Sequence, residues 1–166
     1  RALGLGMTVQ FTQRPPHDRE VSDDELGDLA GHVTQVPWDE LVATSDYLSL
    51  HVPLTEDTTH LVDADVLRRM KSTAVLVNTA RGPVVDEKAL VHALREGQIF
   101  AAGLDVFEHG HEINPRLRDC PNVVMLPHMG SATVEGRAEM GEKVIINIKT
   151  FADGHRPPDL VLPGMA

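Results

Sequence analysis

At residues 74–82 the chain reads AVLVNTARG, an unbroken apolar run that ends in a polar turn with one cation. A short continuous apolar run is typical of a strand that is buried on both faces, as in a parallel α/β sheet. Because such sheets bind ligands just beyond the carboxyl ends of their strands, Arg81 would lie where a substrate binds. A guanidinium can hold a carboxylate through two parallel hydrogen bonds, which a lysine cannot reproduce. Taken alone, an arginine in such a turn is more often an ordinary surface residue.

The sequence on both sides of this stretch alternates between strand and helix patterns. Besides residues 74–78, we expect strands at residues 8–12, 33–36, 47–54, 99–106 and 122–126. We expect a short helix capped by Ser22, helices at residues 38–44, 63–71 and 87–96, and a long helix that is capped by Ser131 or Thr133 and ends near Ala152. This alternation predicts an α/β fold with a doubly wound, Rossmann-like parallel sheet and right-handed crossovers.

The composition excludes several classes of function. The 166 residues carry a formal net charge of −10 without a basic patch, so we expect neither nucleic acid nor an anionic membrane as a partner. The single cysteine, Cys120, excludes an internal disulfide and is typical of a reducing cytoplasm. The segment HGHE at residues 109–112 has no third ligand at a defined spacing, so we expect no metal.

The glycines near the start do not form a dinucleotide fingerprint. Gly4 and Gly6 precede a strand instead of following one, which indicates the end of a helix, and no complete G-x-G-x-x-G occurs in the sequence. In dinucleotide folds an acidic residue at the end of the second strand selects NAD, whereas an arginine accommodates the NADP phosphate. The strand at residues 8–12 is followed by Gln13 and Arg14, so NADP is favoured over NAD, with an ordinary basic loop as the structural alternative.

Titratable residues follow the ends of four expected strands: His51, Arg81, Asp105 and His128. Each has an ordinary structural explanation when taken singly, such as a packed histidine or an aspartate that caps a turn. The carboxyl ends of parallel strands meet at one edge of a sheet, so four such placements together predict a binding or catalytic site there.

These residues belong to motifs that resemble the D-isomer-specific 2-hydroxyacid dehydrogenases, and most closely their glyoxylate/hydroxypyruvate reductase branch. The matching motifs lie, in the family's order and spacing, at residues 45–54 (SDYLSLHVPL), 70–90 (from MK through VNTARGPVVDEKAL), 102–108 (AGLDVFE) and 122–133 (NVVMLPHMGSAT). Asn114-Pro115 and the RPP segment at residues 156–158 are weaker signs of the reductase branch.

The resemblance implies a role for each matching residue. Arg81 would bind the carboxylate of a small 2-keto acid, and His128 would protonate the carbonyl oxygen as a hydride arrives from NADP or NAD. Asp105 would hold the nicotinamide carboxamide. The nicotinamide would be lined by Thr79, Ala80, Gly130 and Ser131, and the ribose and phosphate side by His51, Val52 and Pro53. The resemblance also implies a homodimer.

The chain departs from the family pattern in two ways. The glutamate that pairs with the catalytic histidine is replaced by Gly110, with Glu108 and Glu112 nearby as candidate substitutes. The N-terminal substrate domain, the first strand of the sheet and the phosphate loop are absent from these residues. We therefore expect residues 1–133 to form most of a nucleotide-binding domain, residues 134–166 to pack on the substrate domain, and the N-terminal half to be supplied as a further piece of the same protein.

Two other functions stay open on the sequence. Redox-sensing transcriptional corepressors use the same fold and resemble the enzymes at Arg81 and His128, so these two residues do not separate the classes. A catalytically inactive homologue is the third reading, because of Gly110 and the absent half. Formate dehydrogenase is a poorer match, because residues 130–133 (GSAT) follow the hydroxyacid pattern.

Overall fold

The computed structural model describes residues 1–13, 19–110 and 112–161. The chain forms two compact units, Arg1–Met125 and Leu126–Ala166, and each is described by itself. Among the described residues, no helix combines the length and the apolar character needed to cross a membrane.

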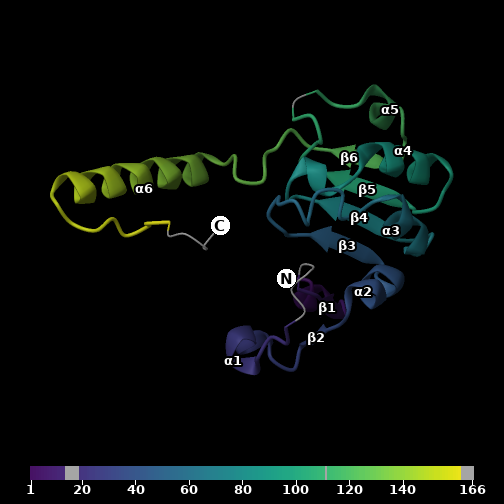
Figure 1. Cartoon of the computed structure of the whole chain (residues 1–166), viewed down its shortest axis with the longest axis horizontal. Coiled ribbons are helices and arrows are strands. Elements are labelled where there is room, and N and C mark those ends of the chain that lie inside the picture. The colour runs from purple at the N-terminus through teal and green to yellow at the C-terminus, as the bar shows by residue number, and fades with distance from the viewer. Residues whose placement is uncertain (14–18, 111, 162–166) are drawn as a thin grey trace. The chain divides into compact units, whose positions relative to one another are not determined.

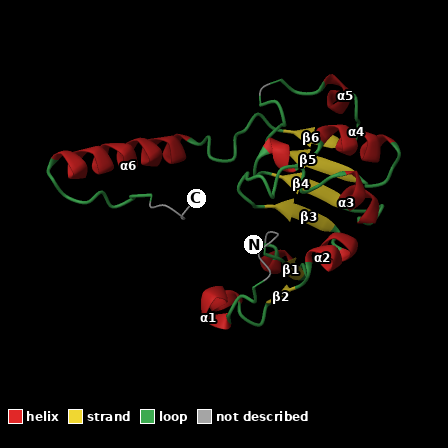
Figure 2. Ribbon diagram, viewed as in Figure 1, coloured by secondary structure: helices red, strands yellow, loops and turns green. Residues whose placement is uncertain are grey.

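The main sheet of the first unit has four parallel strands in the order β3-β4-β5-β6 (Figures 1 and 2). These strands are Tyr47–Leu50, Val75–Asn78, Ala101–Leu104 and Val123–Met125. Their register places Leu50 beside Asn78 and Asn78 beside Leu104. The strand order follows the sequence order, as expected for strands joined by crossovers of one hand.

A separate pair of parallel strands, β1 (Val9–Phe11) and β2 (Val33–Gln35), precedes the main sheet in the chain. Gly6 ends the turn before β1 in a left-handed conformation, with φ of 76°, which confirms that the early glycines end a helical turn. Between β1 and β2, helix α1 (Asp23–Leu26) begins with a capping box in which Ser22 and Glu25 bond each other's backbone.

Three crossover helices cover one face of the main sheet: α2 (Trp38–Thr44), α3 (Ala64–Arg69) and α4 (Glu87–Arg95). They pack on one another and on the strand residues that point to them, such as Leu48, Leu76 and Ala102, all of which are buried. The expectation that residues 74–78 are buried on both faces is wrong. Val75 and Val77 on the opposite face are only half-buried, because the crossover helices that contact one another occupy a single face.

Two elements differ from the sequence prediction. Strand β3 ends at Leu50, whereas residues 47–54 were expected, because the backbone turns away from β4 before His51. Helix α5 (Pro115–Arg118) lies between β5 and β6, where no helix was expected. Asn114 caps α5 by accepting a hydrogen bond from the Arg116 amide at 3.1 Å, and Pro115 occupies its first turn, where a missing N–H costs nothing.

The second unit contains the long helix α6 (Val134–Ala152), which Thr133 caps through the Gly136 amide. The tail folds back on this helix at Asp159. Its carboxylate accepts hydrogen bonds from Lys143 Nζ and Asn147 Nδ2, each at 2.8 Å. These bonds, first of all the one from Lys143, hold the pKa of Asp159 below its ordinary value.

The turn after β4 lies directly against the segment that follows β5. A Cβ atom on Gly82 would be 1.9 Å from the carbonyl oxygen of Phe107 and 2.6 Å from the amide nitrogen of Glu108. The obstructing atoms are backbone atoms, which cannot rotate aside as a flexible side chain can. Only glycine therefore allows the residues next to Arg81 to approach the β5 end this closely.

We predict that Gly82→Ala destabilises the first unit by about 1–3 kcal/mol or more, because the added methyl group overpacks a backbone contact. Gly103→Ala is the matched control, since its Cβ would meet only Val77 Cγ2 at 4.0 Å. Urea unfolding of the three proteins measures the difference. Equal midpoints for Gly82→Ala and the control would contradict the proposed close approach.

We also predict that the contact between the tail and α6 is lost in acid. Because the pKa of Asp159 is lowered in the folded state, its contribution is complete above the ordinary value of 3.8 and disappears as the pH falls through the lower folded pKa. NMR titration of the Asp159 amide, which donates to Asn147 Oδ1 at 3.1 Å, follows this change. In Asp159→Asn the same amide should show no transition in this pH range.

Candidate active site at the carboxyl ends of the strands

Three of the four expected strand ends meet at one edge of the main sheet. His51, Thr79 and Asp105 directly follow Leu50, Asn78 and Leu104, which are neighbours in the register of β3, β4 and β5. The Asp105 amide also donates to the Asn78 carbonyl at 3.0 Å, which joins the ends of β4 and β5. The strand ends that precede His51, Arg81 and Asp105 therefore lie side by side at one edge of the sheet.

The buried side chain of Asn78 holds the turn that presents Arg81. Its Oδ1 accepts a hydrogen bond from the Ala80 amide at 3.0 Å, and its Nδ2 donates to the Arg81 carbonyl at 3.0 Å. Asn78 is 1% exposed, so water cannot replace either partner at low cost. Asn78 was not predicted as a site residue, although an amide side chain directly after an apolar run and before a turn was a signal of it.

Arg81 lies in an exposed part of this turn. The residue is exposed and its backbone is extended, and its Nη1 donates to the Ala80 carbonyl at 2.7 Å. This bond uses one of the five guanidinium donors, so the remaining donors can take a planar anion. Thr79 beside it is exposed as well, whereas Ala80 is buried under the turn.

Asp105 and Glu108 differ in their environment, although they lie three residues apart. Asp105 is 5% exposed and sits at the end of β5. Glu108 Oε1 lies 2.9 Å from His60 Nε2, within reach of a hydrogen bond or an ion pair. Glu108 Oε2 accepts a hydrogen bond from the Glu87 amide at 3.2 Å. In return, the Glu108 amide donates to Glu87 Oε1 at 2.6 Å. Glu108 is one of the two candidates, with Glu112, to replace the glutamate that the family has at residue 110. Its carboxylate is engaged by His60 and Glu87 within the first unit.

This exchange between Glu87 and Glu108 fixes the start of α4 to the end of β5. Glu87 is the first residue of α4 and is 4% exposed, with its Oε2 buried and unsatisfied among the described residues. A buried carboxylate is tolerated at a helix N-terminus because the amides there carry partial positive charge. Together with the Gly82 contact, the pair holds the segment that follows Arg81 against the end of β5.

The segment after β3 contains the residues expected on the ribose and phosphate side. His51 is exposed and its Nε2 lies 2.9 Å from Ser49 Oγ. Val52 is half-buried and Pro53 is exposed. Thr58, which is fully buried, donates to the Pro53 carbonyl at 2.6 Å and accepts from the Thr55 amide at 2.8 Å. Thr58 therefore fixes the shape of this loop. The sequence pattern did not predict this role.

The other predicted site residues lie in the second unit or outside the described residues. His128 is exposed and adopts a positive φ of 56°, a conformation that is uncommon for a residue with a side chain. Gly130 and Ser131 follow in the turn that leads to Thr133 and α6. Arg14 lies outside the described residues, as does His111 of the HGHE segment. Within residues 1–13, 19–110 and 112–161, no three His, Cys, Asp or Glu side chains gather as metal ligands would.

The sequence is similar to proteins of one family. Residues 1–130 match the family described as D-isomer specific 2-hydroxyacid dehydrogenase, NAD binding domain. A glyoxylate reductase of Korarchaeum cryptofilum is 48% identical over 163 residues, which are 97% of this chain and 47% of that protein. The chain spans about half the length of the curated relatives that it matches.

Solved structures show the same fold. The crystal structure of a glyoxylate reductase from Paecilomyes thermophila matches with a TM-score of 0.80 and 36% identity, over 90% of this chain and 43% of that one. An acyclic imino acid reductase in complex with NADPH and D-Arg matches with a TM-score of 0.79 and 31% identity, over 97% of this chain and 48% of that one. By its sequence and by its parallel Rossmann-like sheet, the chain belongs to the D-isomer-specific 2-hydroxyacid dehydrogenase family and contains the region of its NAD-binding domain.

Proposed function

We propose that this chain takes part in the NAD(P)H-dependent reduction of a small 2-keto acid, glyoxylate or hydroxypyruvate, to the D-2-hydroxy acid. The observation that carries the proposal is the turn of residues 79–82, which Asn78 holds at the carboxyl edge of a parallel sheet with the Arg81 guanidinium exposed. The family match and the glyoxylate reductases among the relatives support the same reaction class.

Arg81 binds the carboxylate of the keto acid in this proposal. Two parallel hydrogen bonds from a guanidinium fix both the position and the plane of a carboxylate. The positive charge beside the keto group also favours the negative charge that grows on its oxygen during reduction. The fixed turn orients the guanidinium before the substrate arrives, so little conformational entropy is lost on binding.

His128 supplies the proton. The reduction adds a hydride to the carbonyl carbon and a proton to its oxygen, and the imidazolium of His128 gives that proton from a ring nitrogen. In the reverse reaction the neutral imidazole takes the proton back. Histidine suits this exchange because its ordinary pKa lies near neutral pH.

The residues of the first unit suit a nicotinamide dinucleotide at the same edge. The Asp105 carboxylate would accept a hydrogen bond from the carboxamide, and Thr79 and Ala80 would line the nicotinamide ring, with Gly130 and Ser131. A bound cofactor supplies the hydride. His51, Val52 and Pro53 would border its ribose and phosphates. Because β1 is followed by Gln13 and Arg14 and not by an acid, we favour NADP over NAD.

The test is an activity assay on the complete gene product. Oxidation of NADPH and of NADH is followed with glyoxylate, hydroxypyruvate and pyruvate. Turnover with at least one keto acid is expected. Dinucleotide binding without turnover of any of them would contradict the proposal and favour a corepressor-like protein or an inactive homologue. Sedimentation of the same sample tests the expected homodimer.

We predict that Arg81→Lys lowers kcat/KM for the keto acid on the order of tenfold to a hundredfold, because one charged bidentate contact is lost. The matched control is Arg118→Lys, which makes the same change at an exposed arginine on α5, away from the turn. The dissociation constant for the dinucleotide should change little in either variant. A kcat/KM for Arg81→Lys equal to that of the control would show that Arg81 does not bind the carboxylate.

Gly110 stands where the family usually has a glutamate, and this difference predicts how keto-acid reduction depends on pH. A carboxylate beside His128 would raise its pKa and keep the proton donor charged to higher pH. Keto-acid reduction by the natural protein should therefore fall off at lower pH than in Gly110→Glu. Gly110→Ala is the control, because it imposes the same strain at a φ of 65° without a charge. Identical pH profiles of kcat/KM for Gly110→Glu and Gly110→Ala would refute this role.

A further inference from the structure

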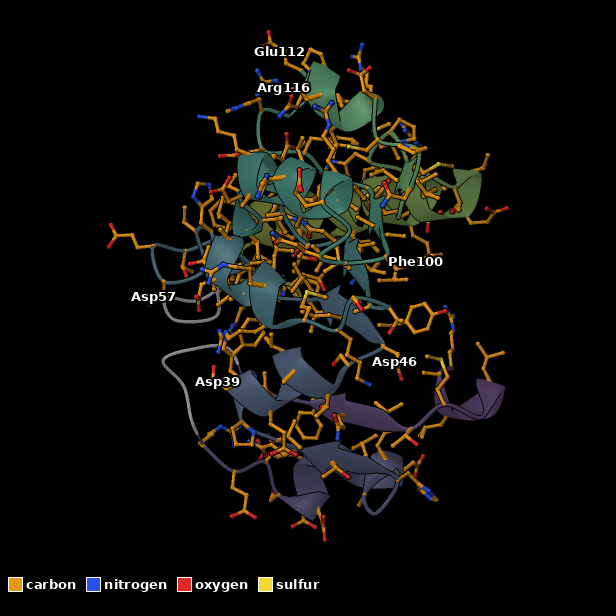
Figure 3. All side chains as sticks on the ribbon, turned by 90° about the vertical axis from the view of Figure 1, so that its right-hand side faces the viewer. Asp39, Asp46, Asp57, Phe100, Glu112 and Arg116 are labelled. Carbon is orange, nitrogen blue, oxygen red and sulfur yellow. The ribbon has the colours of Figure 1, made fainter. Side chains whose placement is uncertain are left out.

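The loop between β3 and α3 connects the residues expected at the cofactor with the turn that carries Arg81. It spans residues 51–62, from the end of β3 to the residue before the cap of α3. Its far end lies against the segment after Arg81, because the His60 amide donates to the Pro83 carbonyl at 2.8 Å. Asp57, in the middle of the loop, lies at the exterior of the first unit (Figure 3). The loop is thus a direct connection between the two expected binding regions.

Thr58 holds this loop together as one piece. Its hydroxyl is buried, donates to the Pro53 carbonyl at 2.6 Å and lies 3.1 Å from the Thr55 hydroxyl. The Leu61 amide donates to the Thr58 carbonyl at 3.2 Å, which extends the same turn to the residue after His60. Buried hydrogen bonds of this kind are costly to break, because water cannot replace the lost partner. A contact made at Pro53 can therefore restrain His60.

His60 adopts a backbone conformation that favours glycine. Its φ is 52°, and among the described residues that carry a side chain only His128 shares a positive φ. A residue with a Cβ is less stable than glycine in this conformation. The backbone bond to Pro83 is open to any residue, glycine included. The imidazole adds a contact to Glu108, whose Oε1 lies 2.9 Å from Nε2, and this contact distinguishes histidine from glycine here.

Through Glu108, His60 also reaches the end of β5. Glu108 exchanges hydrogen bonds with Glu87 at the start of α4, and its backbone lies against Gly82. The side chain of Glu108 is 19% exposed and that of His60 is 42% exposed, so the pair is partly shielded from water on the Glu108 side. His60 thus joins three segments: the loop after β3, the segment after Arg81 and the end of β5.

We propose that His60 is a positioning residue that couples dinucleotide binding to keto-acid binding. A dinucleotide that contacts the loop at His51 and Pro53 restrains the loop, and His60 passes this restraint to the Arg81 turn. The keto acid then binds a turn that is already ordered, so less conformational entropy is lost. By thermodynamic linkage, the keto acid strengthens dinucleotide binding by the same factor. This role rests on the keto-acid reduction proposed above, because it needs both ligands at this edge.

The test measures how much a dinucleotide strengthens the binding of oxamate, an unreactive amide analogue of a 2-keto acid. Isothermal titration calorimetry is run on the complete gene product with and without saturating NADPH or NADH. In the natural protein we expect the dinucleotide to strengthen oxamate binding about fivefold or more. In His60→Leu this factor should fall about threefold or more, because the contact with Glu108 is lost. His60→Gln should retain the factor, since its side-chain amide can donate to Glu108.

A further variant, His60→Gly, separates coupling from stability. Glycine adopts a φ of 52° without strain, so His60→Gly should unfold at the same urea concentration as His60→Leu or at a higher one. The effect of the dinucleotide on oxamate binding should nevertheless be as small as in His60→Leu. His32→Leu, at an exposed histidine in the turn before β2, is the distant control and should keep the natural factor. A purely structural role of His60 would instead make the coupling follow stability across the variants.

Three results would overturn the role of His60. Equal dinucleotide effects in the natural protein and in His60→Leu would show that His60 does not couple the two ligands. A loss in His60→Gln as large as that in His60→Leu would show that the contact with Glu108 does not carry the coupling. Oxamate binding that ignores the dinucleotide in the natural protein would exclude the coupling itself. Keto-acid turnover alongside any of these results leaves the proposed function intact, whereas the absence of both turnover and oxamate binding contradicts both proposals.

Discussion

The contact between the backbone of Gly82 and that of Phe107 and Glu108 is the constraint on which the candidate site depends. It brings the turn after β4 onto the segment after β5, at a separation that no side chain at residue 82 would allow. The exchange of hydrogen bonds between Glu87 and Glu108 holds the same two segments from the other side. Arg81 follows the turn that Asn78 holds and directly precedes these contacts, so hydrogen bonds before it and backbone packing after it set the position of its backbone.

The parallel sheet explains why these groups meet at all. Strands β3, β4 and β5 run in the same direction and in register, so the residues that follow them gather at one edge. Crossover helices pass over one face and leave that edge open to a ligand.

Local signals in the sequence were sufficient for most elements. The caps predicted at Ser22 and at Ser131 or Thr133 mark helices that the structure contains, with Thr133 as the cap of the long one. Side-chain hydrogen bonds outside the helices and strands were not predicted. Asn78 bonds across a turn, Thr58 bonds inside a loop, and Glu87 and Glu108 pair across 21 positions, and none of these bonds leaves a periodic pattern. The half-exposed Val75 was misjudged because an apolar run does not tell how many faces helices cover.

Native-state hydrogen exchange tests most directly whether the Arg81 turn is fixed by the fold. The relevant amides are those of Ala80, which donates to Asn78 Oδ1 at 3.0 Å, and Glu108, which donates to Glu87 Oε1 at 2.6 Å. We predict that both exchange as slowly as Leu76 in the centre of β4, because they open only when the sheet opens. Exchange of Ala80 and Glu108 at the rate of an exposed loop, with Leu76 still protected, would show that the turn is not held by these contacts.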